Sequence, residues 1–240
     1  SCRVRYQCSD LGWSEWTDPF SFTTADAKYV FIVGESSGLF PIGVQVFNTG
    51  DLSANEKEFA LGVRASGLVY DGTYIYVLTA ESPTEIKKIK YSDTTLNQSI
   101  DINTVFTPSN ANDVEGLKLE MSSDGSEIFV LGKDSVTSSQ AYILKFLSSD
   151  LSLIDSYEEP NGFSALDFKV DNSDTVFMGV LEGDLIKLDS NLTELQRNTE
   201  STKANHIEFV DSGEILLTDT SNNLLIKLPS KDFASFSSSG

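Results

Sequence analysis

Short runs of alternating apolar and polar residues recur along the chain, separated by turns rich in Asp, Asn, Ser and Gly. One such unit spans residues 67–78 around Asp71 and Gly72, and similar units span residues 117–131, 165–180 and 206–218. Alternation with a period of two places every second side chain on one face of a strand, and Asp and Gly suit tight hairpin turns. The pattern therefore predicts a series of β-hairpins.

A second marker follows each hairpin and consists of an apolar residue, a lysine and a further apolar or aromatic residue before a polar turn. Its copies contain Lys90, Lys145, Lys187 and Lys227, with a fainter copy at Gln45. Repeats of about 40 to 50 residues with four strands each are typical of β-propellers. We therefore predict an all-β fold, with a β-propeller of about five four-stranded blades over residues 26–240.

The hairpin at residues 71–77, Asp-Gly-Thr-Tyr-Ile-Tyr-Val, resembles the NHL and Tyr-Val-Thr-Asn families of bacterial and viral propellers. The resemblance implies the propeller fold and little about function. The first repeat has no innermost strand before Tyr29 unless residues 20–24 supply it, and the last has only residues 232–236 as a candidate outer strand. Because open sheet edges invite unwanted pairing, we expect a closing strand from beyond Gly240 or an irregular ring.

The first 25 residues form a separate pattern of two alternating runs around a turn at residues 9–12, which predicts a hairpin. Residues 13–17 resemble the Trp-Ser-x-Trp-Ser signature of fibronectin type III modules, as found in cytokine receptors and in microbial and phage proteins. The resemblance implies that residues 1–25 are the C-terminal end of such a module, a type common in extracellular and virion-surface chains. It also implies a cation–π ladder made of Arg3, Arg5, Trp13 and Trp16.

The two cysteines, Cys2 and Cys8, lie in one predicted strand. Their Cα atoms would be roughly 20 Å apart in an extended strand, whereas a disulfide needs about 4.4–6.8 Å. They should not pair with each other unless the strand breaks. A bond to a missing segment or to a neighbouring chain, and two free thiols, are the alternatives.

The chain is strongly acidic, with 17 Lys and Arg against 36 Asp and Glu and a formal net charge of −19. This charge repels phosphate backbones and anionic membranes, which argues against nucleic acid as a partner. No apolar run approaches the roughly 18–20 residues that span a bilayer, so we expect no membrane insertion. The sequence opens inside a strand pattern and is expected to be a piece of a longer protein.

Candidate chemistry is sparse, and we predict no catalytic residue. His206 is the single histidine, and no Gly-x-Ser-x-Gly elbow, Walker loop or dinucleotide loop accompanies it. Glu115, Asp167 and Glu208 follow the entry to three predicted inner strands, so with His206 they are candidate binding residues near one end of a central channel. Paired carboxylates could hydrolyse glycosides or bind Ca²⁺, but no cofactor is required by the pattern.

Together these features favour an extracellular structural or recognition protein, with a virion tail fibre or spike component as the first hypothesis. A cell-surface or secreted filament or adhesin, and a carbohydrate-active propeller enzyme, are the alternatives. The expected partners are other subunits of an assembly, a second copy of the chain, or a glycan. We expect the loops at residues 81–83 and 133–140 to carry the binding or assembly contacts.

Overall fold

The computed structural model describes residues 7–8, 12–13, 29–34, 43–48, 51–80, 82–110, 112–198, 204–210, 214–219, 222 and 224–228. Within these ranges the regular structure is β-strand apart from one short helix, α1 (Ile102–Val105). None of the helical structure in the described ranges has the length and apolarity needed to cross a bilayer. The predicted all-β character is confirmed for this part of the chain.

Three antiparallel sheets contain four strands each, in sequential order. The second sheet along the chain contains β6 (Ala65–Tyr70), β7 (Tyr74–Thr79), β8 (Glu85–Lys90) and β9 (Leu96–Asp101). The third contains β10 (Val114–Met121), β11 (Glu127–Asp134), β12 (Ala141–Leu147) and β13 (Leu153–Glu158). The fourth contains β14 (Ala165–Val170), β15 (Val176–Val180), β16 (Leu185–Leu188) and β17 (Glu194–Asn198).

The first and fifth sheets have three strands each in the described residues. The first contains β3 (Tyr29–Gly34), β4 (Gly43–Asn48) and β5 (Asp51–Ala60). The fifth contains β18 (His206–Phe209), β19 (Ile215–Asp219) and β20 (Leu224–Leu228). Residues 20–24 and 232–236, the candidates for missing strands, lie outside the described residues.

The strand missing from each end sheet can be assigned from equivalent pairs. In the third and fourth sheets, a lysine of the third strand lies opposite a residue of the second strand (Lys145 in β12, Lys187 in β16). Lys227 of β20 lies opposite β19 in the same way, so β20 corresponds to a third strand. In the first sheet, Lys57 of β5 donates to the carbonyl of Tyr91 in the next sheet (2.6 Å), and outer strand β9 makes the equivalent bond through Gln98. Among the described residues, therefore, the first sheet has no inner strand and the fifth has no outer one.

A short hairpin precedes the five sheets. β1 (Gln7–Cys8) pairs with β2 (Gly12–Trp13) in antiparallel register, so the predicted hairpin around residues 9–12 is present in the backbone. Arg3, Arg5, Trp16 and Cys2 lie outside the described residues, and only the backbone of Trp13 and Cys8 is described. The cation–π ladder and the cysteine pairing remain predictions.

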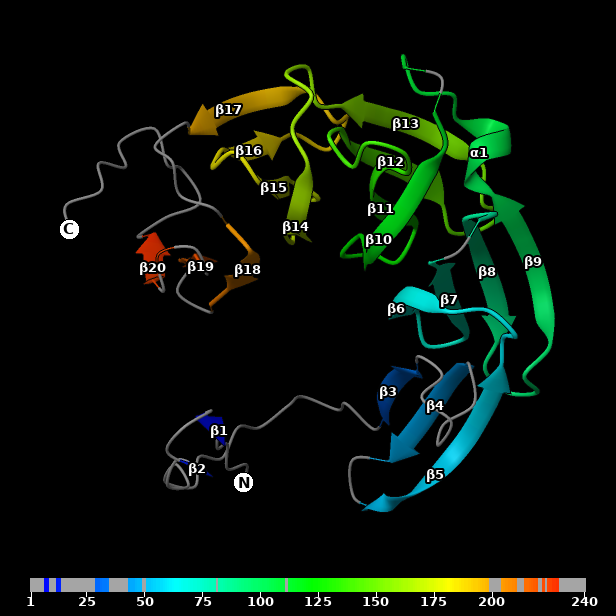
Figure 1. Cartoon of the computed structure of the whole chain (residues 1–240). Coiled ribbons are helices and arrows are strands. Elements are labelled where there is room, and N and C mark those ends of the chain that lie inside the picture. The colour runs from blue at the N-terminus through cyan, green and yellow to red at the C-terminus, as the bar shows by residue number, and fades with distance from the viewer. Residues whose placement is uncertain are drawn as a thin grey trace.

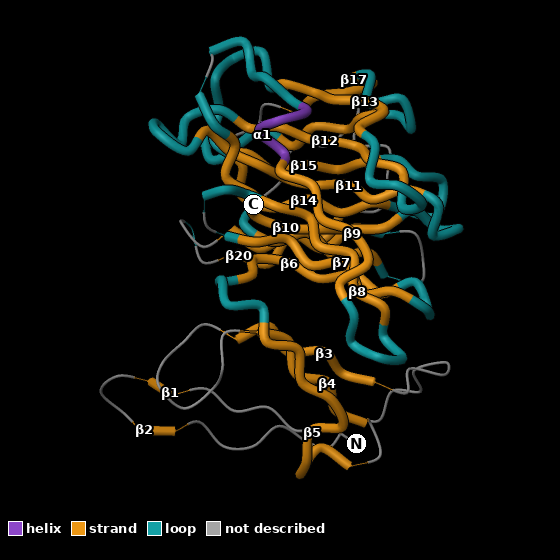
Figure 2. Tube along the Cα trace, turned by 90° about the vertical axis from the view of Figure 1, so that its right-hand side faces the viewer, coloured by secondary structure: helices purple, strands orange, loops and turns teal. Residues whose placement is uncertain are grey.

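The five sheets follow one another along an arc, with β6, β10, β14 and β18 toward its centre and β5, β9, β13 and β17 toward its rim (Figure 1). Neighbouring inner strands contact each other, β6 with β10, β10 with β14, and β14 with β18. Loops lie at both edges of the stacked strands (Figure 2). The first and fifth sheets lie at the two ends of the arc, and their described strands do not form a sealed ring.

The core consists of four apolar clusters, each between two consecutive sheets. The second strand of each four-stranded sheet contributes to the clusters on both of its faces, and every residue of β15 is buried. Burial on both faces explains why residues 176–180 include no polar side chain. Packing between sheets, rather than within one sheet, holds the arc together.

The turns use aspartate as the sequence indicates. The Oδ1 atom of Asp71 accepts the backbone N–H groups of Thr73 (2.7 Å) and Tyr74 (2.6 Å), and that of Asp171 accepts those of Ser173 (2.8 Å) and Thr175 (3.1 Å). Such Asx turns satisfy backbone donors that the strand ladder leaves unpaired.

Two details of the sequence analysis are corrected by the register. The second-repeat equivalent of Lys145 is Lys88, not Lys90, because Lys88 donates to the Ser148 carbonyl of the following sheet as Lys145 donates to the Ser190 carbonyl. Three lysines lie close together in β8, and spacing alone does not choose among them. The loop expected at residues 133–140 begins only after Asp134, because β11 extends to that residue.

Candidate functional site

Two rows of charged side chains run across the inner strands of the third, fourth and fifth sheets, and we call them the inner charge ladder. The first row occupies equivalent register positions in β10, β14 and β18, opposite the second strand of each sheet. Its members are Lys118, Asp167 and His206. The second row lies two residues further along each strand. Its members are Glu120, Lys169 and Glu208.

In the first row the carboxylate of Asp167 joins three inner strands. Its Oδ1 atom lies 2.7 Å from Lys118 Nζ, and its Oδ2 atom accepts the Ile207 N–H (2.8 Å) and lies 2.9 Å from His206 Nδ1. Lys118 Nζ also donates to the Phe168 carbonyl at 2.9 Å. Asp167 is only 5% exposed, so these contacts compensate the loss of water around a buried charge.

In the second row Lys169 lies between two acidic residues. Its Nζ atom is 3.5 Å from Glu120 and 3.4 Å from Glu208, and Glu120 is also 3.4 Å from Lys118 of the first row. Burial lowers the pKa of Lys169, but the charges of Glu120 and Glu208 outweigh it, so the net pKa is raised. The charges therefore alternate in sign along the second row, and in the first row a lysine and a carboxylate are followed by an imidazole.

The candidate residues of the sequence analysis do not form one group. Asp167, His206 and Glu208 belong to the ladder, whereas Glu115 lies nearer the loop edge, where its carboxylate is 3.3 Å from Lys133 Nζ. The carboxylates of Glu115, Asp167 and Glu208 occupy three different register positions along their inner strands. The register shifts between Gly116 and Lys118 in β10 and between residues 165 and 167 in β14 contribute to this difference. A bulge inserts one residue into a strand, and alternation of polar residues does not reveal it.

Glu115 instead lines a cavity of about 180 Å³ between the second and third sheets. The walls combine two carboxylates, an amide and three hydroxyls with the apolar side chains of Ala80 and Val114. The polar lining residues are Ser82, Thr84, Asn103, Asp113, Glu115 and Ser135. The loops expected to carry contacts, at residues 81–83 and 133–140, thus meet at one cavity through Ser82 and Ser135.

The wall of this cavity is held in place by Asp134, which is fully buried. Its Oδ1 atom accepts the Val136 and Thr137 N–H groups at 2.7 Å, and its Oδ2 atom accepts the amides of Asn112 (2.7 Å) and Asn110. Burial raises the pKa of Asp134, but these hydrogen bonds outweigh it and lower the pKa to about 2. The segment before β10 and the loop after β11 are therefore tied to one carboxylate.

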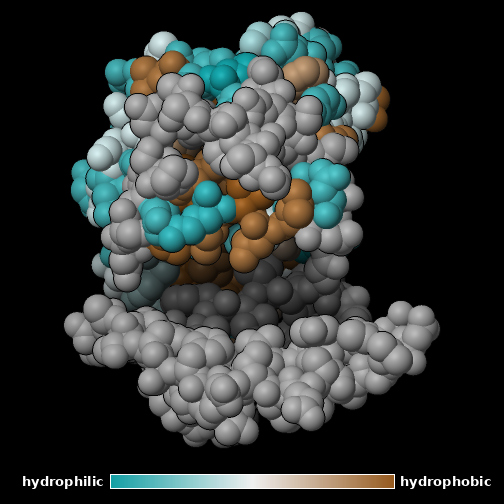
Figure 3. Space-filling view, turned by 90° about the vertical axis from the view of Figure 1, so that its left-hand side faces the viewer, coloured by the Kyte–Doolittle hydropathy of each residue, from teal (hydrophilic) through white to brown (hydrophobic). Residues whose placement is uncertain are grey.

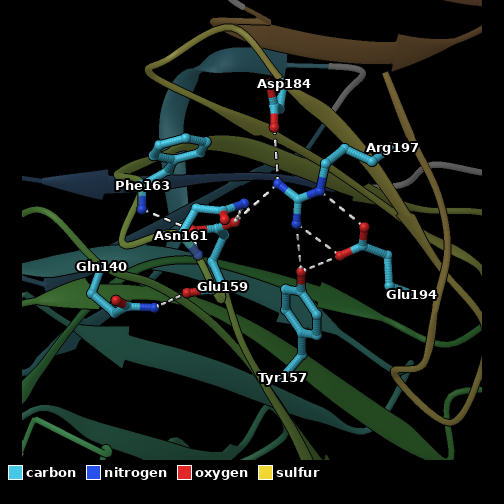
Figure 4. A network of polar contacts seen from close by, with 8 residues as sticks. All are labelled: Gln140, Tyr157, Glu159, Asn161, Phe163, Asp184, Glu194 and Arg197. Atoms are coloured by element: carbon cyan, nitrogen blue, oxygen red, sulfur yellow. Dashed lines mark hydrogen bonds and ion pairs between the residues drawn. The ribbon is translucent and has the colours of Figure 1, made fainter. Parts of the chain in front are cut away.

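A second polar network, which no sequence motif indicated, joins the third and fourth sheets around Arg197 (Figure 4). The guanidinium bonds Glu159 and Asp184 at 2.9 Å, Glu194 at 2.7 Å and the Tyr157 hydroxyl at 3.1 Å. All five N–H donors of Arg197 are used in these contacts. The network is saturated, which suits a structural tie between sheets rather than a ligand site.

A further cavity, of about 320 Å³, lies between the outer strands of the first and second sheets and is lined by Phe59, Leu61 and Leu96 among others. Within the described ranges, no group of three or more His, Cys, Asp or Glu residues is placed to hold a metal ion. Binding of Ca²⁺ remains a prediction.

No family model matches the sequence, and no curated protein matches it. Solved structures do match the fold. The β-propeller domain of Myceliophteria thermophila Cps50 (Swd1) aligns with a TM-score of 0.61 at 10% identity, over 77% of this chain and 62% of that one. The chain has a β-propeller-type fold.

Two other solved structures are similar to the chain over most of its length. A protein of unknown function from Bacteroides caccae aligns with a TM-score of 0.60 at 13% identity, over 87% of this chain and 70% of that one. The computationally designed Ika4 protein aligns with a TM-score of 0.52 at 12% identity, over 69% of this chain and 90% of that one. At such identities the likeness extends to the propeller-type fold alone.

Proposed function

We propose that this propeller-type chain acts by binding, as a recognition and assembly component, and that the cavity beside Glu115 binds a small polyhydroxylated group such as the terminal residue of a glycan. The observation that carries the proposal is the meeting of Ser82, Ser135 and two carboxylates in one cavity. An extracellular appendage, either a virion tail fibre or spike or a cell-surface filament or adhesin, is the setting we propose.

The chemistry of the walls supports a sugar more than an apolar ligand. Sugar hydroxyls both donate and accept hydrogen bonds, and the carboxylates of Asp113 and Glu115 are strong acceptors beside the serine hydroxyls. Pockets for drug-sized apolar ligands are usually about 300–1,000 Å³ and mostly apolar. A cavity of about 180 Å³ with polar walls fits a single small polar group.

The fixed geometry of the walls supports binding with little reorganisation. Asp134 holds the loops beside the cavity through four hydrogen bonds, and Asn103 Oδ1 accepts the Val114 N–H at 2.7 Å. Because the wall is already ordered, binding carries a smaller entropic cost from immobilising side chains.

Glycoside hydrolysis is the second candidate, because Asp113 and Glu115 place two carboxylates in the same cavity. Glycosidases use such a pair when the carboxyl groups lie about 5–9.5 Å apart on either side of a glycosidic bond. Binding without turnover favours recognition, and release of product favours hydrolysis.

A glycan array followed by calorimetry with the best glycan tests the proposal. Glu115→Gln and Asp113→Asn should each weaken binding about tenfold or more, because a hydrogen bond to a charged group contributes about 1.5–3 kcal/mol. Glu182→Gln, an exposed carboxylate in the turn before β16, is the matched control and should bind like the parent. Binding that is equal in all three variants would exclude the cavity.

A further inference from the structure

Each sheet of the arc has a leading face, toward the following sheet, and a trailing face, toward the preceding one. At one register position on the leading face, the residue of the third strand is buried in the second, third and fourth sheets. These residues are Ile86, Ile143 and Leu185, with exposures of 0%, 0% and 4%. Leu225 of β20 holds the same register position in the fifth sheet but is 71% exposed.

In the second and third sheets, the lysine two residues further along the third strand is also buried against the following sheet. Lys88 Nζ donates to the Ser148 carbonyl of the following sheet at 2.8 Å, and Lys145 makes the same kind of bond to a turn of the fourth sheet at 2.8 Å. Both lysines are buried. Lys187 of the fourth sheet is half-buried. Lys227 holds the equivalent position in the fifth sheet, and its side chain is 59% exposed. It pairs with Glu214 of its own hairpin at 2.8 Å, as Lys145 pairs with Glu127 at 2.7 Å.

The last residues of the inner charge ladder, His206 and Glu208, lie on the leading face of the fifth sheet. The side chains of His206 and Glu208 are 58% and 49% exposed, although each continues a row of paired charges. Figure 3 views the side of the molecule on which β18, β19 and β20 lie in Figure 1, and it shows apolar residues gathered between polar ones. The fifth sheet therefore presents the same features that bind the next sheet elsewhere in the arc.

The first sheet carries the opposite half of such an interface. Phe47 of β4 lies on the face opposite to the one that buries Val44 and Val46 against the second sheet. The residues equivalent to Phe47 are buried against the preceding sheet in all four following sheets. They are Ile89, Phe146, Leu188 and Leu228.

We propose that the leading face of the fifth sheet binds the trailing face of the first sheet of a second copy of this chain, head to tail. Each chain carries both halves of the interface, and Figure 1 places them at opposite ends of one arc. The contact continues the interface that already joins the sheets within the chain. A heterologous contact of this kind closes into a ring or extends as a filament.

Sedimentation velocity of the whole chain, from micromolar to submillimolar concentration, tests the proposal. The weight-average mass of the parent should rise with concentration. Leu225→Asp and Phe47→Asp should each weaken self-association at least about tenfold, because each buries a charge in the apolar part of the contact. Leu195→Asp changes a leucine that is 58% exposed on the outer strand β17 and is the matched control.

A mixture of the two defective variants gives the sharpest outcome. The Leu225→Asp chain keeps an intact first sheet and the Phe47→Asp chain keeps an intact fifth sheet, so the mixture should form dimers but no longer species. Circular dichroism melts verify that each variant is folded. A parent that stays monomeric at every concentration, as ring closure within one molecule would produce, overturns the proposal. So does association that Leu225→Asp leaves unchanged.

Discussion

Asp134 shows how one buried side chain fixes a loop that sequence patterns describe only as polar. The sequence indicates that the region after β11 is a turn, but it does not distinguish Asp134 from the exposed aspartates of other turns. Its role depends on Asn110 and Asn112, more than 20 residues away, whose amides converge on the same carboxylate. Contacts between distant segments of this kind need the tertiary structure.

The pKa of Asp134 predicts acid sensitivity of this part of the molecule. A carboxyl with a folded pKa of about 2 and an unfolded value of about 3.9 takes up its proton first in the unfolded chain. Its stabilising contribution is therefore complete above about pH 4 and is lost as the pH falls toward about 2. Asp134→Asn should cost about 1–3 kcal/mol near neutral pH, because an amide nitrogen would face the donors of Asn110 and Asn112.

Urea unfolding between neutral pH and pH 2 measures this effect. The difference in unfolding free energy between the parent and Asp134→Asn should shrink as the pH falls through the window from about 4 to about 2. Ser135→Ala, in the same loop, removes no titrating group and is the control. A difference that is independent of pH would show that Asp134 contributes through packing alone.

At the scale of strands, the sequence predicted where the hairpins lie but not the register in which their strands pair. Alternation and Asp or Gly turns located the hairpins, because both signals are local. The bulges in β10 and β14 are not visible in alternation, so the sequence placed Glu115, Asp167 and Glu208 together although only the last two belong to the ladder. Lys118 and Lys169, which pair with those carboxylates, were missed for the same reason.

A double-mutant cycle tests whether the inner charge ladder stabilises the contact between sheets. Lys118→Met and Asp167→Asn should be strongly non-additive, with a coupling of about 0.5–3 kcal/mol, because the pair is 2.7 Å apart and Asp167 is buried. The control cycle is Lys90→Met with Asp93→Asn, a pair 3.4 Å apart whose side chains are 45% and 48% exposed. Exposed pairs are usually worth about 0–1 kcal/mol. The coupling free energies are measured by urea unfolding. If they are equal in the two cycles, the ladder pair stabilises the fold no more than an exposed surface pair does.

At the scale of the whole molecule, the repeat predicted the architecture better than the chemistry. A regular spacing of hairpins is enough to predict stacked sheets, since each sheet must bury its apolar faces against a neighbour. The same repetition masks function, because the positions that recur are those that pack. The cavity beside Glu115 combines loops from two repeats, and only the fold brings Ser82 and Ser135 together.

The net charge of the chain leads to a prediction for its overall stability. Nineteen excess negative charges repel one another in the folded molecule, and salt screens this repulsion over a Debye length of about 8–10 Å. The melting temperature should therefore rise as NaCl is added, by about 2–4 °C for each kcal/mol gained in a domain of this size. Salt also weakens the ladder pairs, but burial shields pairs such as that of Asp167 from screening.

Calcium at matched ionic strength separates screening from specific binding. If oxygen ligands converge on a Ca²⁺ ion, CaCl₂ should add a saturable rise in melting temperature beyond that given by NaCl, and MgCl₂ at the same concentration is the control for divalent screening. A melting temperature that falls with NaCl would mean that attractive pairs such as the ladder outweigh the net repulsion. Scanning calorimetry of the parent beside Glu208→Gln would then decide, because Glu208 is the most exposed carboxylate of the ladder and its removal should reduce that sensitivity to salt.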